Sequence, residues 1–174
     1  MVIAKKIISL LFLFTFFTSN AFSQDIYFLD FSYVMNQSKA GKEAQTFLNN
    51  KVLKENKKLQ DLEKKLLEEE KLLISKKAIL KNEDYKKKVD ELRKKVIALR
   101  EKRGNFSKMI NKQRAEARTQ ILKNLNPILT DYMKEKNIKI VLDKRNILIG
   151  VIELDLTKLM IDQLNTKLKS LNLK

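Results

Sequence analysis

The sequence contains no cysteine and no histidine, and it has only three glycines and one proline among its 174 residues. The chain therefore has no histidine acid–base catalyst, no cysteine nucleophile, no disulfide and few ways to build a zinc site. Three glycines are also too few for a phosphate-binding loop or a dinucleotide-binding fingerprint. The carboxylates lie among lysines, as is typical of solvated helix surfaces. We expect no catalytic, cofactor-binding or metal-binding residues and no enzyme activity.

Positive charge dominates, with 37 basic and 21 acidic residues and a formal net charge of +16. Such a charge favours acidic proteins and anionic membrane surfaces as partners and speeds their encounter with the chain. Nucleic acid also fits the charge, but the sequence has no groove-reading motif and no aromatic platform. We therefore expect no specific nucleic-acid binding, and any nonspecific binding should vanish with salt.

Residues 1–23 have the pattern of a secretory signal peptide. Lys5 and Lys6 precede an apolar run over residues 7–17, and Ala21-Phe22-Ser23 matches the small-residue pattern of a cleavage site. We predict cleavage after Ser23 and export of the mature protein. The alternative is a membrane anchor, for which the apolar run is shorter than the roughly 20 residues that a spanning helix needs.

Residues 43–125 have no proline and a single glycine, and they are rich in Lys, Glu, Leu and Gln. This composition favours long helices. Apolar residues recur at coiled-coil spacing in two series, from Leu48 to Leu80 and from Tyr85 to Ala117, and polar residues interrupt each series. The turn-like run over residues 81–84 separates them, so we predict an antiparallel helical hairpin with its tip near 81–84. The alternative is one straight helix in an intermolecular coiled coil.

Several apolar residues of the arm fall outside both series, and we interpret them as candidate contacts for a bound polypeptide. The alternative for each is that it widens the seam between the helices. Gly104 interrupts the second helix and is a candidate hinge, although a harmless surface glycine explains it equally well. The candidate contacts are Leu53, Leu67, Leu72, Ile74, Ile79, Ile97 and Met109.

Residues 24–42 and 126–174 should form a small β-rich oligomerisation body. We predict strands over 25–31, 138–143 and 147–152, the last two joined as a hairpin. Ser38 should cap the helix that starts at Lys39, with Gly41 marking close packing in its first turn. Asn126-Pro127 should end the long helix and begin a short one. Asp155 should cap a final helix with an apolar stripe formed by Leu159, Met160, Leu164, Leu168 and Leu171.

The predicted body is too small to bury a large core, and its three apolar strands leave open edges. Pairing between subunits would cover these edges, and a cyclic homo-oligomer would place all arms on one side. The residues alone do not determine the number of subunits. The fold class that we predict is α+β, mostly α: a long antiparallel helical hairpin, or coiled-coil arm, projecting from a small three-stranded β body with a C-terminal helix.

The two ends of the mature chain resemble the Skp/OmpH family of periplasmic chaperones. The resemblance rests on residues 26–31 (IYFLDF), 34–42 (VMNQSKAGK), 140–144 (IVLDK) and 155–157 (DLT), followed by Leu159 and Leu164. The order of signal peptide, strand, basic helical hairpin, strands and helix is similar as well. The resemblance implies a periplasmic homotrimer with a β-rich body and three helical arms around a cavity. It identifies no client-contact residue and no lipopolysaccharide site.

The resemblance implies an ATP-independent holdase that binds unfolded outer-membrane β-barrel proteins in the cavity between the arms. Interrupted apolar seams and positive charge agree with loose binding of such clients. The alternative is a non-catalytic periplasmic coiled-coil spacer or adaptor protein. A spacer would bind one partner stoichiometrically and would not bind denatured barrel proteins.

Overall fold

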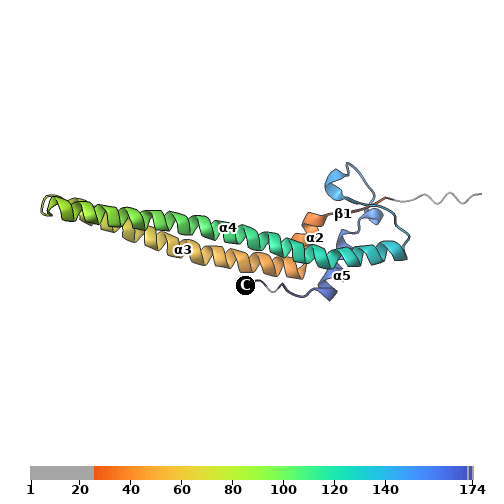
Figure 1. The fold of residues 1–174 in the computed structure, drawn as a ribbon. Coiled ribbons are helices and arrows are strands. Elements are labelled where there is room, and N and C mark those ends of the chain that lie inside the picture. The colour runs from red at the N-terminus through yellow and green to blue at the C-terminus, as the bar shows by residue number, and fades with distance from the viewer. Residues whose placement is uncertain (1–25, 172, 174) are drawn as a thin grey trace, which may run out of the picture.

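The computed structural model describes residues 26–171 and 173, which form a long two-helix arm and a small body (Figure 1). The predicted signal peptide lies outside the described residues. The predicted class, α+β and mostly α with a projecting helical hairpin, is confirmed. In chain order the elements are β1 (Tyr27–Leu29), α2 (Phe31–Gln37), α3 (Lys39–Ser75), α4 (Asn82–Glu135), β2 (Val141–Asp143), the 3-10 turns η1 (Lys144–Asn146) and η2 (Ile152–Leu154), and α5 (Thr157–Lys167).

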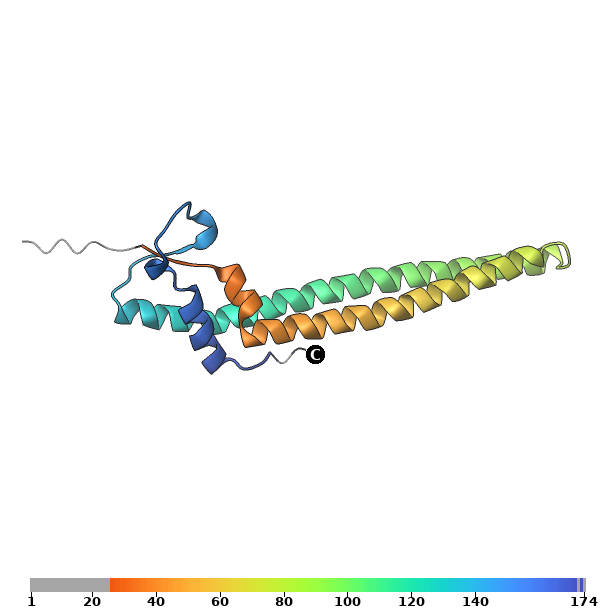
Figure 2. The same ribbon diagram turned by 180° about the vertical axis from the view of Figure 1, so that it is seen from behind.

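Helices α3 and α4 lie side by side and antiparallel, and they form the arm (Figures 1 and 2). The 37 residues of α3 span about 55 Å at the usual helical rise. The turn between the helices occupies residues 76–81, a few residues before the predicted tip. Glu83 and Asp84 belong instead to the first turn of α4, where negative charge complements the helix dipole. The alternative of a single straight helix is wrong.

A tight corner joins α2 to α3. Ser38 Oγ accepts a hydrogen bond from the Gly41 N–H at 3.2 Å, as its predicted role of helix cap requires. A Cβ atom on Gly41 would lie 1.7 Å from the carbonyl oxygen of Met35. The close packing expected at this glycine is therefore confirmed, because no larger residue fits between the two helices.

The predicted helix break at Asn126-Pro127 is wrong, because α4 continues through Pro127 to Glu135. An internal proline costs a helix about 3 kcal/mol through a missing N–H and a steric clash. Ile121, Leu125 and Ile128 are each only 1–2% exposed on the same stretch of helix. Burying each of these side chains contributes about 1.5–3 kcal/mol, so their combined burial outweighs the proline. The arm and the body thus share one continuous helix.

The body contains a two-stranded parallel sheet in which Phe28 of β1 lies opposite Leu142 of β2. The predicted third strand over 147–152 and its hairpin with 138–143 are wrong. After β2 the chain passes through η1 and η2 and returns beside β1, where Phe28 also bridges to Asp155. The Leu156 N–H donates to the Phe28 carbonyl at 2.9 Å. The segment 147–152 therefore loops outward instead of pairing with β2.

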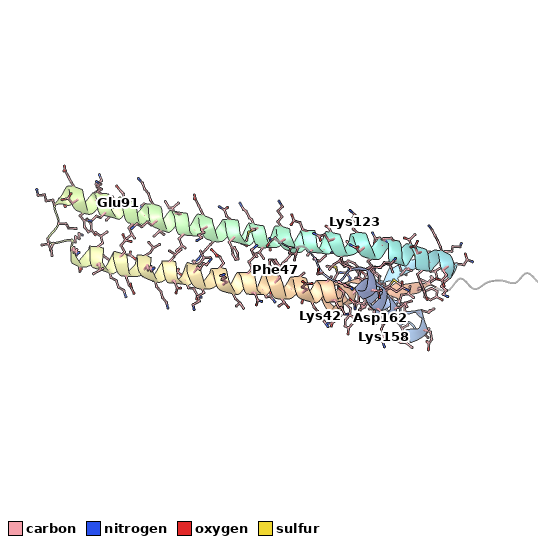
Figure 3. The ribbon with its side chains drawn as sticks, turned by 90° about the horizontal axis from the view of Figure 1, so that it is seen from below. Lys42, Phe47, Glu91, Lys123, Lys158 and Asp162 are labelled. Carbon is pink, nitrogen blue, oxygen red and sulfur yellow. The ribbon has the colours of Figure 1, made fainter. Side chains whose placement is uncertain are left out.

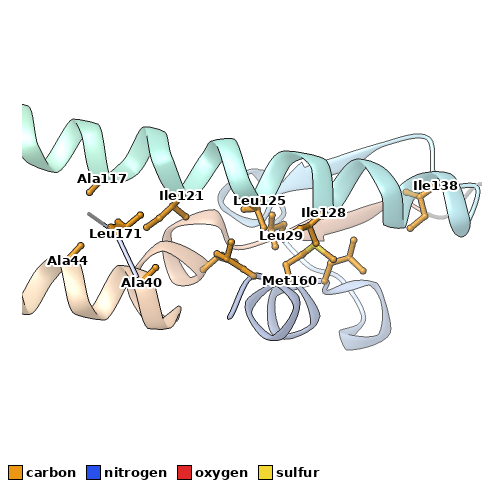
Figure 4. Packing of buried hydrophobic residues seen from close by; sticks show 13 residues of the cluster. Leu29, Ala40, Ala44, Ala117, Ile121, Leu125, Ile128, Ile138, Met160 and Leu171 are labelled. Atoms are coloured by element: carbon orange, nitrogen blue, oxygen red, sulfur yellow. The ribbon is translucent and has the colours of Figure 1, made fainter. Parts of the chain in front are cut away.

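The core lies where α2, α5 and the base of the arm meet (Figure 4). The predicted stripe of the final helix is confirmed for Leu159, Met160 and Leu164, which are buried or partly buried on α5. The helix ends at Lys167, so Leu168 and Leu171 pack on the core from the segment after it. Asp155 accepts the Thr157 N–H at 2.9 Å, although Leu156 is the capping residue. Thr157 Oγ1 in turn accepts the Asp30 N–H at 2.8 Å and ties the end of β1 to α5.

Within residues 26–171 and 173, none of the helices combines the length and the apolar character that a membrane span needs.

The two helical glycines predict opposite effects for the same substitution. Gly41→Ala should destabilise the protein by about 1–3 kcal/mol, because the new methyl group has no space. Gly104→Ala is the matched control and should stabilise it by about 1 kcal/mol, since nothing lies within 4 Å of its Cβ position. Denaturant unfolding followed by circular dichroism measures both. Equal shifts in the two variants would contradict the tight corner.

Candidate functional site

The seam between α3 and α4 contains few buried apolar side chains. Leu59 and Leu73 from α3 and Leu92 and Ile110 from α4 are buried between the helices. Between these buried layers other members of the predicted series stay open, and Val96 is 43% exposed. Figure 3 shows side chains projecting from both helices along the whole length of the arm. A two-helix seam with so few buried layers leaves other apolar side chains of the arm, such as Leu62 and Val96, exposed to solvent.

Polar contacts cross the seam where the apolar series are interrupted. Glu63 pairs with Arg103 at 2.6 Å, Glu69 with Lys95 at 2.5 Å and Glu55 with Lys102 at 3.5 Å. A hydrogen bond from Lys58, together with charge from Lys58 and Lys102, lowers the pKa of Glu55 against the opposing effect of its desolvation. Exposed pairs of this kind contribute little to stability, because solvent screens the charges and the long side chains lose freedom when they pair.

Two grooves open along the seam. A groove of about 460 Å³ is lined mainly by apolar side chains, among them Leu66, Leu67, Val89 and Val96. A second groove, of about 440 Å³, lies nearer the body and is more polar, with Arg103 and Arg114 in its lining. Both grooves are open to solvent along the arm, and together they provide apolar surface bordered by charge.

All seven candidate contacts of the arm are exposed. The exposed fractions range from 36% for Met109 to 81% for Ile79. None of them is buried between the helices, and Leu67 lines the apolar groove along the seam. They are distributed from Leu53 near the body to the turn at the far end, so they form a series of separate apolar contacts and not one patch. Their role in binding stays a prediction.

Gly104 lies within the unbroken α4 helix and is exposed. The helix continues through Gly104 without a break, so the structure shows no hinge there. A hinge at Gly104 stays a prediction.

The most exposed apolar segment of the described chain is on the body. Leu148 is fully exposed and Ile149 is 90% exposed, with Val151 and Ile152 at 60% and 75%. The sequence predicts a strand here, which pairing between subunits would cover. Glycine is unfavourable inside a strand, so Gly150 is the sequence signal that could have indicated a loop. In the structure it packs against Phe28, and a Cβ atom there would lie 2.8 Å from the Phe28 ring. We define residues 148–152 as the body loop.

Ion pairs hold the residues on either side of the body loop. Lys144 pairs with Asp155 at 2.7 Å and lies over the Phe28 ring. Hydrogen bonds from the side chain and backbone N–H of Arg145 lower the pKa of Asp143 to about 2. These contacts hold η1 close to β1 while the body loop projects between its two anchored ends.

Comparisons with known proteins identify the family to which this chain belongs. A family model described as outer membrane protein (OmpH-like) matches residues 25–164. The chain belongs to the OmpH-like family. No curated protein sequence matches it significantly. An OmpH-like protein from Caulobacter crescentus CB15, assigned as an outer membrane chaperone, has a similar crystal structure with a TM-score of 0.78. The two chains are 19% identical, and the similarity covers 88% of this chain and 90% of the other, so it shows that the fold is shared.

The OmpH-like chain should keep Asp143 ionised in mild acid. With the pKa lowered to about 2, the carboxylate contributes stability above its ordinary pKa of 3.8 and loses it only as the pH falls toward 2. At pH 3 the carboxyl NMR signal of Asp143 should therefore still be that of the charged form. Arg145→Gln should raise this pKa toward 3.8 and leave the group mostly protonated at pH 3. Lys144→Gln is the control and should not shift Asp143. An unchanged Asp143 signal in Arg145→Gln would contradict this pairing.

Proposed function

We propose that this OmpH-like protein is an ATP-independent holdase chaperone of the periplasm, which binds unfolded outer-membrane β-barrel proteins in a cavity between the arms of a homotrimer. The observation that carries the proposal is the row of exposed apolar residues along a long basic arm. The assignment of the Caulobacter relative as an outer membrane chaperone supports the general role.

Loose binding follows from the spacing of the contacts. Each exposed leucine or isoleucine on the arm offers a client only part of its apolar area, at roughly 25 cal/mol per Å² buried. Several such contacts keep an apolar strand out of solution, but each one breaks easily. A client that folds elsewhere buries its own apolar surface, so it can leave the arms without nucleotide hydrolysis.

Positive charge should speed capture. Residues 51–103 contain 19 basic and 11 acidic residues, and most of them lie on the solvated faces of the arm. A field of this sign attracts acidic clients and the anionic surfaces of membranes over about one Debye length, near 10 Å at moderate salt. Capture should therefore slow as salt increases, whereas the apolar contacts should persist.

Assembly through the body would explain why the apolar residues of the body loop are exposed in the single chain. Four apolar residues with exposed fractions of 60% or more are costly for a solvated segment, and a contiguous apolar patch usually marks an interface. The sheet beside it has only two strands and an edge that pairing with another subunit could extend. Three bodies joined in this way would place their arms around a common space.

Substitution of exposed apolar residues of the arm tests the proposed holdase activity directly. Leu53, Leu67, Ile97 and Met109 changed together to Ser should reduce suppression of aggregation when a urea-denatured barrel protein is diluted into buffer. The expected loss of client affinity is about tenfold or more, because several partial apolar contacts disappear. Light scattering of the precipitating client measures the effect.

The matched control changes four exposed polar residues of the arm that lie outside both grooves, Thr46, Asn50, Asn105 and Thr119, to Ser. The control should suppress aggregation as well as the parent protein does. A parent protein that leaves the denatured client to aggregate would overturn the holdase and favour a spacer. Equal activity of the parent and the quadruple apolar variant would show that these four side chains are not client contacts.

Charges placed in the body loop test the assembly. Leu148→Asp combined with Ile149→Asp should convert the trimer to monomer, because the charges would have to be buried at the interface without partners. Multi-angle light scattering gives the mass of the particle. Ile97→Asp, on the arm, should leave the mass unchanged. A parent protein that is already monomeric would overturn the proposed trimer.

A further inference from the structure

The chain continues past the end of α5 and returns to the arm. Helix α5 ends at Lys167, and the residues after it turn toward the root of the arm (Figures 1 and 2). We define residues 168–171 as the strap. Its two middle residues are exposed, whereas Leu168 is partly buried and Leu171 is only 8% exposed. The family model matches residues 25–164, so the strap lies beyond the part of the fold that this model describes.

Leu171 fills a hollow that three alanines leave between the arm helices. Farther out the buried residues of the seam are leucines and an isoleucine, but at the root they include Ala40 and Ala44 of α3 and Ala117 of α4. Alanine side chains are too short to fill the space between two packed helices, and protein interiors contain few voids. Figure 4 shows Leu171 beside these alanines and Ile121. The strap therefore supplies the side chain that packs between α3 and α4 at this level.

Helix α5 and the strap contact the long helix α4 at two separate levels. Met160 of α5 is fully buried in the core beside Ile128 of α4, and Leu171 lies beside Ala117 (Figure 4). The 11 positions between Ala117 and Ile128 correspond to about 16 Å along the helix. A single contact lets one element pivot on another, but two contacts this far apart fix the angle between them.

Small movements at the root become large at the far end of the arm. Because α3 is about 55 Å long, a rotation of about 5° at the root moves its far end by about 5 Å. The Lys39 N–H donates to Asn165 Oδ1 at 2.7 Å and also joins α3 to α5. This hydrogen bond lies at the first residue of α3, so it has little leverage on the rest of the helix.

We propose that Leu171 is a positioning residue, which fixes the angle between the arm and the body by packing between α3 and α4. Without this side chain, α5 would still hold α4 through Met160 and Ile128, and the arm would swing about that contact. The width of the space beside the arm would then vary. The inference deepens the proposed function, and its consequence for clients rests on that function.

Two spin labels in one chain measure the arm angle directly. The parent protein has no cysteine, so Lys64→Cys on α3 and Lys158→Cys on α5, both at exposed positions, carry the only labels. Labelled mature chains are mixed with an excess of unlabelled chains, so that only distances within one chain contribute. Double electron–electron resonance gives the distribution of these distances. The parent should give one narrow distribution, and Leu171→Ala should broaden it about twofold or more, because a cavity replaces the second contact.

The matched control is Leu73→Ala at the far end of the arm. Leu73 and Leu171 are each 8% exposed, so the two variants lose the same atoms from equally buried sites. Leu73→Ala should keep the narrow distribution, because Leu73 lies farther from the body than the label on α3. Leu171→Met preserves the volume of the side chain and should keep it as well. Parental width in Leu171→Ala, or equal broadening in Leu73→Ala, would overturn the proposal.

Circular dichroism and particle mass show whether each variant keeps its fold and assembly. Were Leu171→Ala to unfold, Leu171→Val would replace it, because this substitution removes only one methylene group. A folded Leu171→Val should still broaden the distribution, and the parental width in this variant would then refute the positioning role.

Client assays separate the strap from the holdase. Leu171→Ala should bind a urea-denatured barrel protein about threefold more weakly, since a less preorganised arm loses more conformational freedom on binding. Parental client affinity in a variant with broadened distances would overturn the consequence for clients. A parent protein that does not suppress aggregation would refute the holdase, and the distance measurement would still decide the role of Leu171.

Discussion

The burial of one face of α4 between Ala117 and Ile128 is the interaction on which the rest of the molecule depends. Ile121, Leu125 and Ile128 form the part of the core that α2, α5 and the start of α3 cover. Because the same helix continues outward as half of the arm, this contact both forms part of the core of the body and anchors the arm to it. Without it, a small two-stranded sheet would have to anchor a rod about 55 Å long.

The outer arm is held together by much weaker means. Few apolar layers are buried beyond Ile110, and exposed ion pairs such as Glu63 with Arg103 fill the interruptions. A narrow seam uses few of the leucines and isoleucines of the arm, so the others remain at the surface. The proposed loose binding of apolar polypeptides rests on this same narrow seam.

The body has the opposite character. Its contacts are specific and of long range: Thr157 accepts the N–H of Asp30, 127 positions earlier in the chain, and Asn165 accepts that of Lys39. Its exposed apolar residues are concentrated in the body loop, next to a short sheet with an open edge. A contiguous patch of this kind suits a permanent neighbour, whereas the scattered residues of the arm suit transient ones.

Local patterns determined much of this structure. The helical arm, the Ser38 cap, the tight corner at Gly41 and the stripe of α5 could all be predicted, because each depends on residues within a few positions of one another. The positions of the seven arm residues outside the apolar series left both exposure and seam packing open, and the structure exposes all seven. The turn was placed only approximately, since Asn82, Glu83 and Asp84 favour a helix start as well as a turn.

Tertiary contacts decided what local patterns could not. Pro127 should end a helix, but burial of the isoleucines and leucine around it outweighs that preference. Residues 147–152 have the composition of a strand, but they do not pair with β2: the chain passes through η1 and η2 and returns so that Asp155 bridges to Phe28 of β1. The competition in both cases is between a local preference of a few kcal/mol and contacts with residues distant in the chain. The sequence by itself therefore determined the helical arm and the start of α3, and only the tertiary structure decided which segments pair and where the long helix stops.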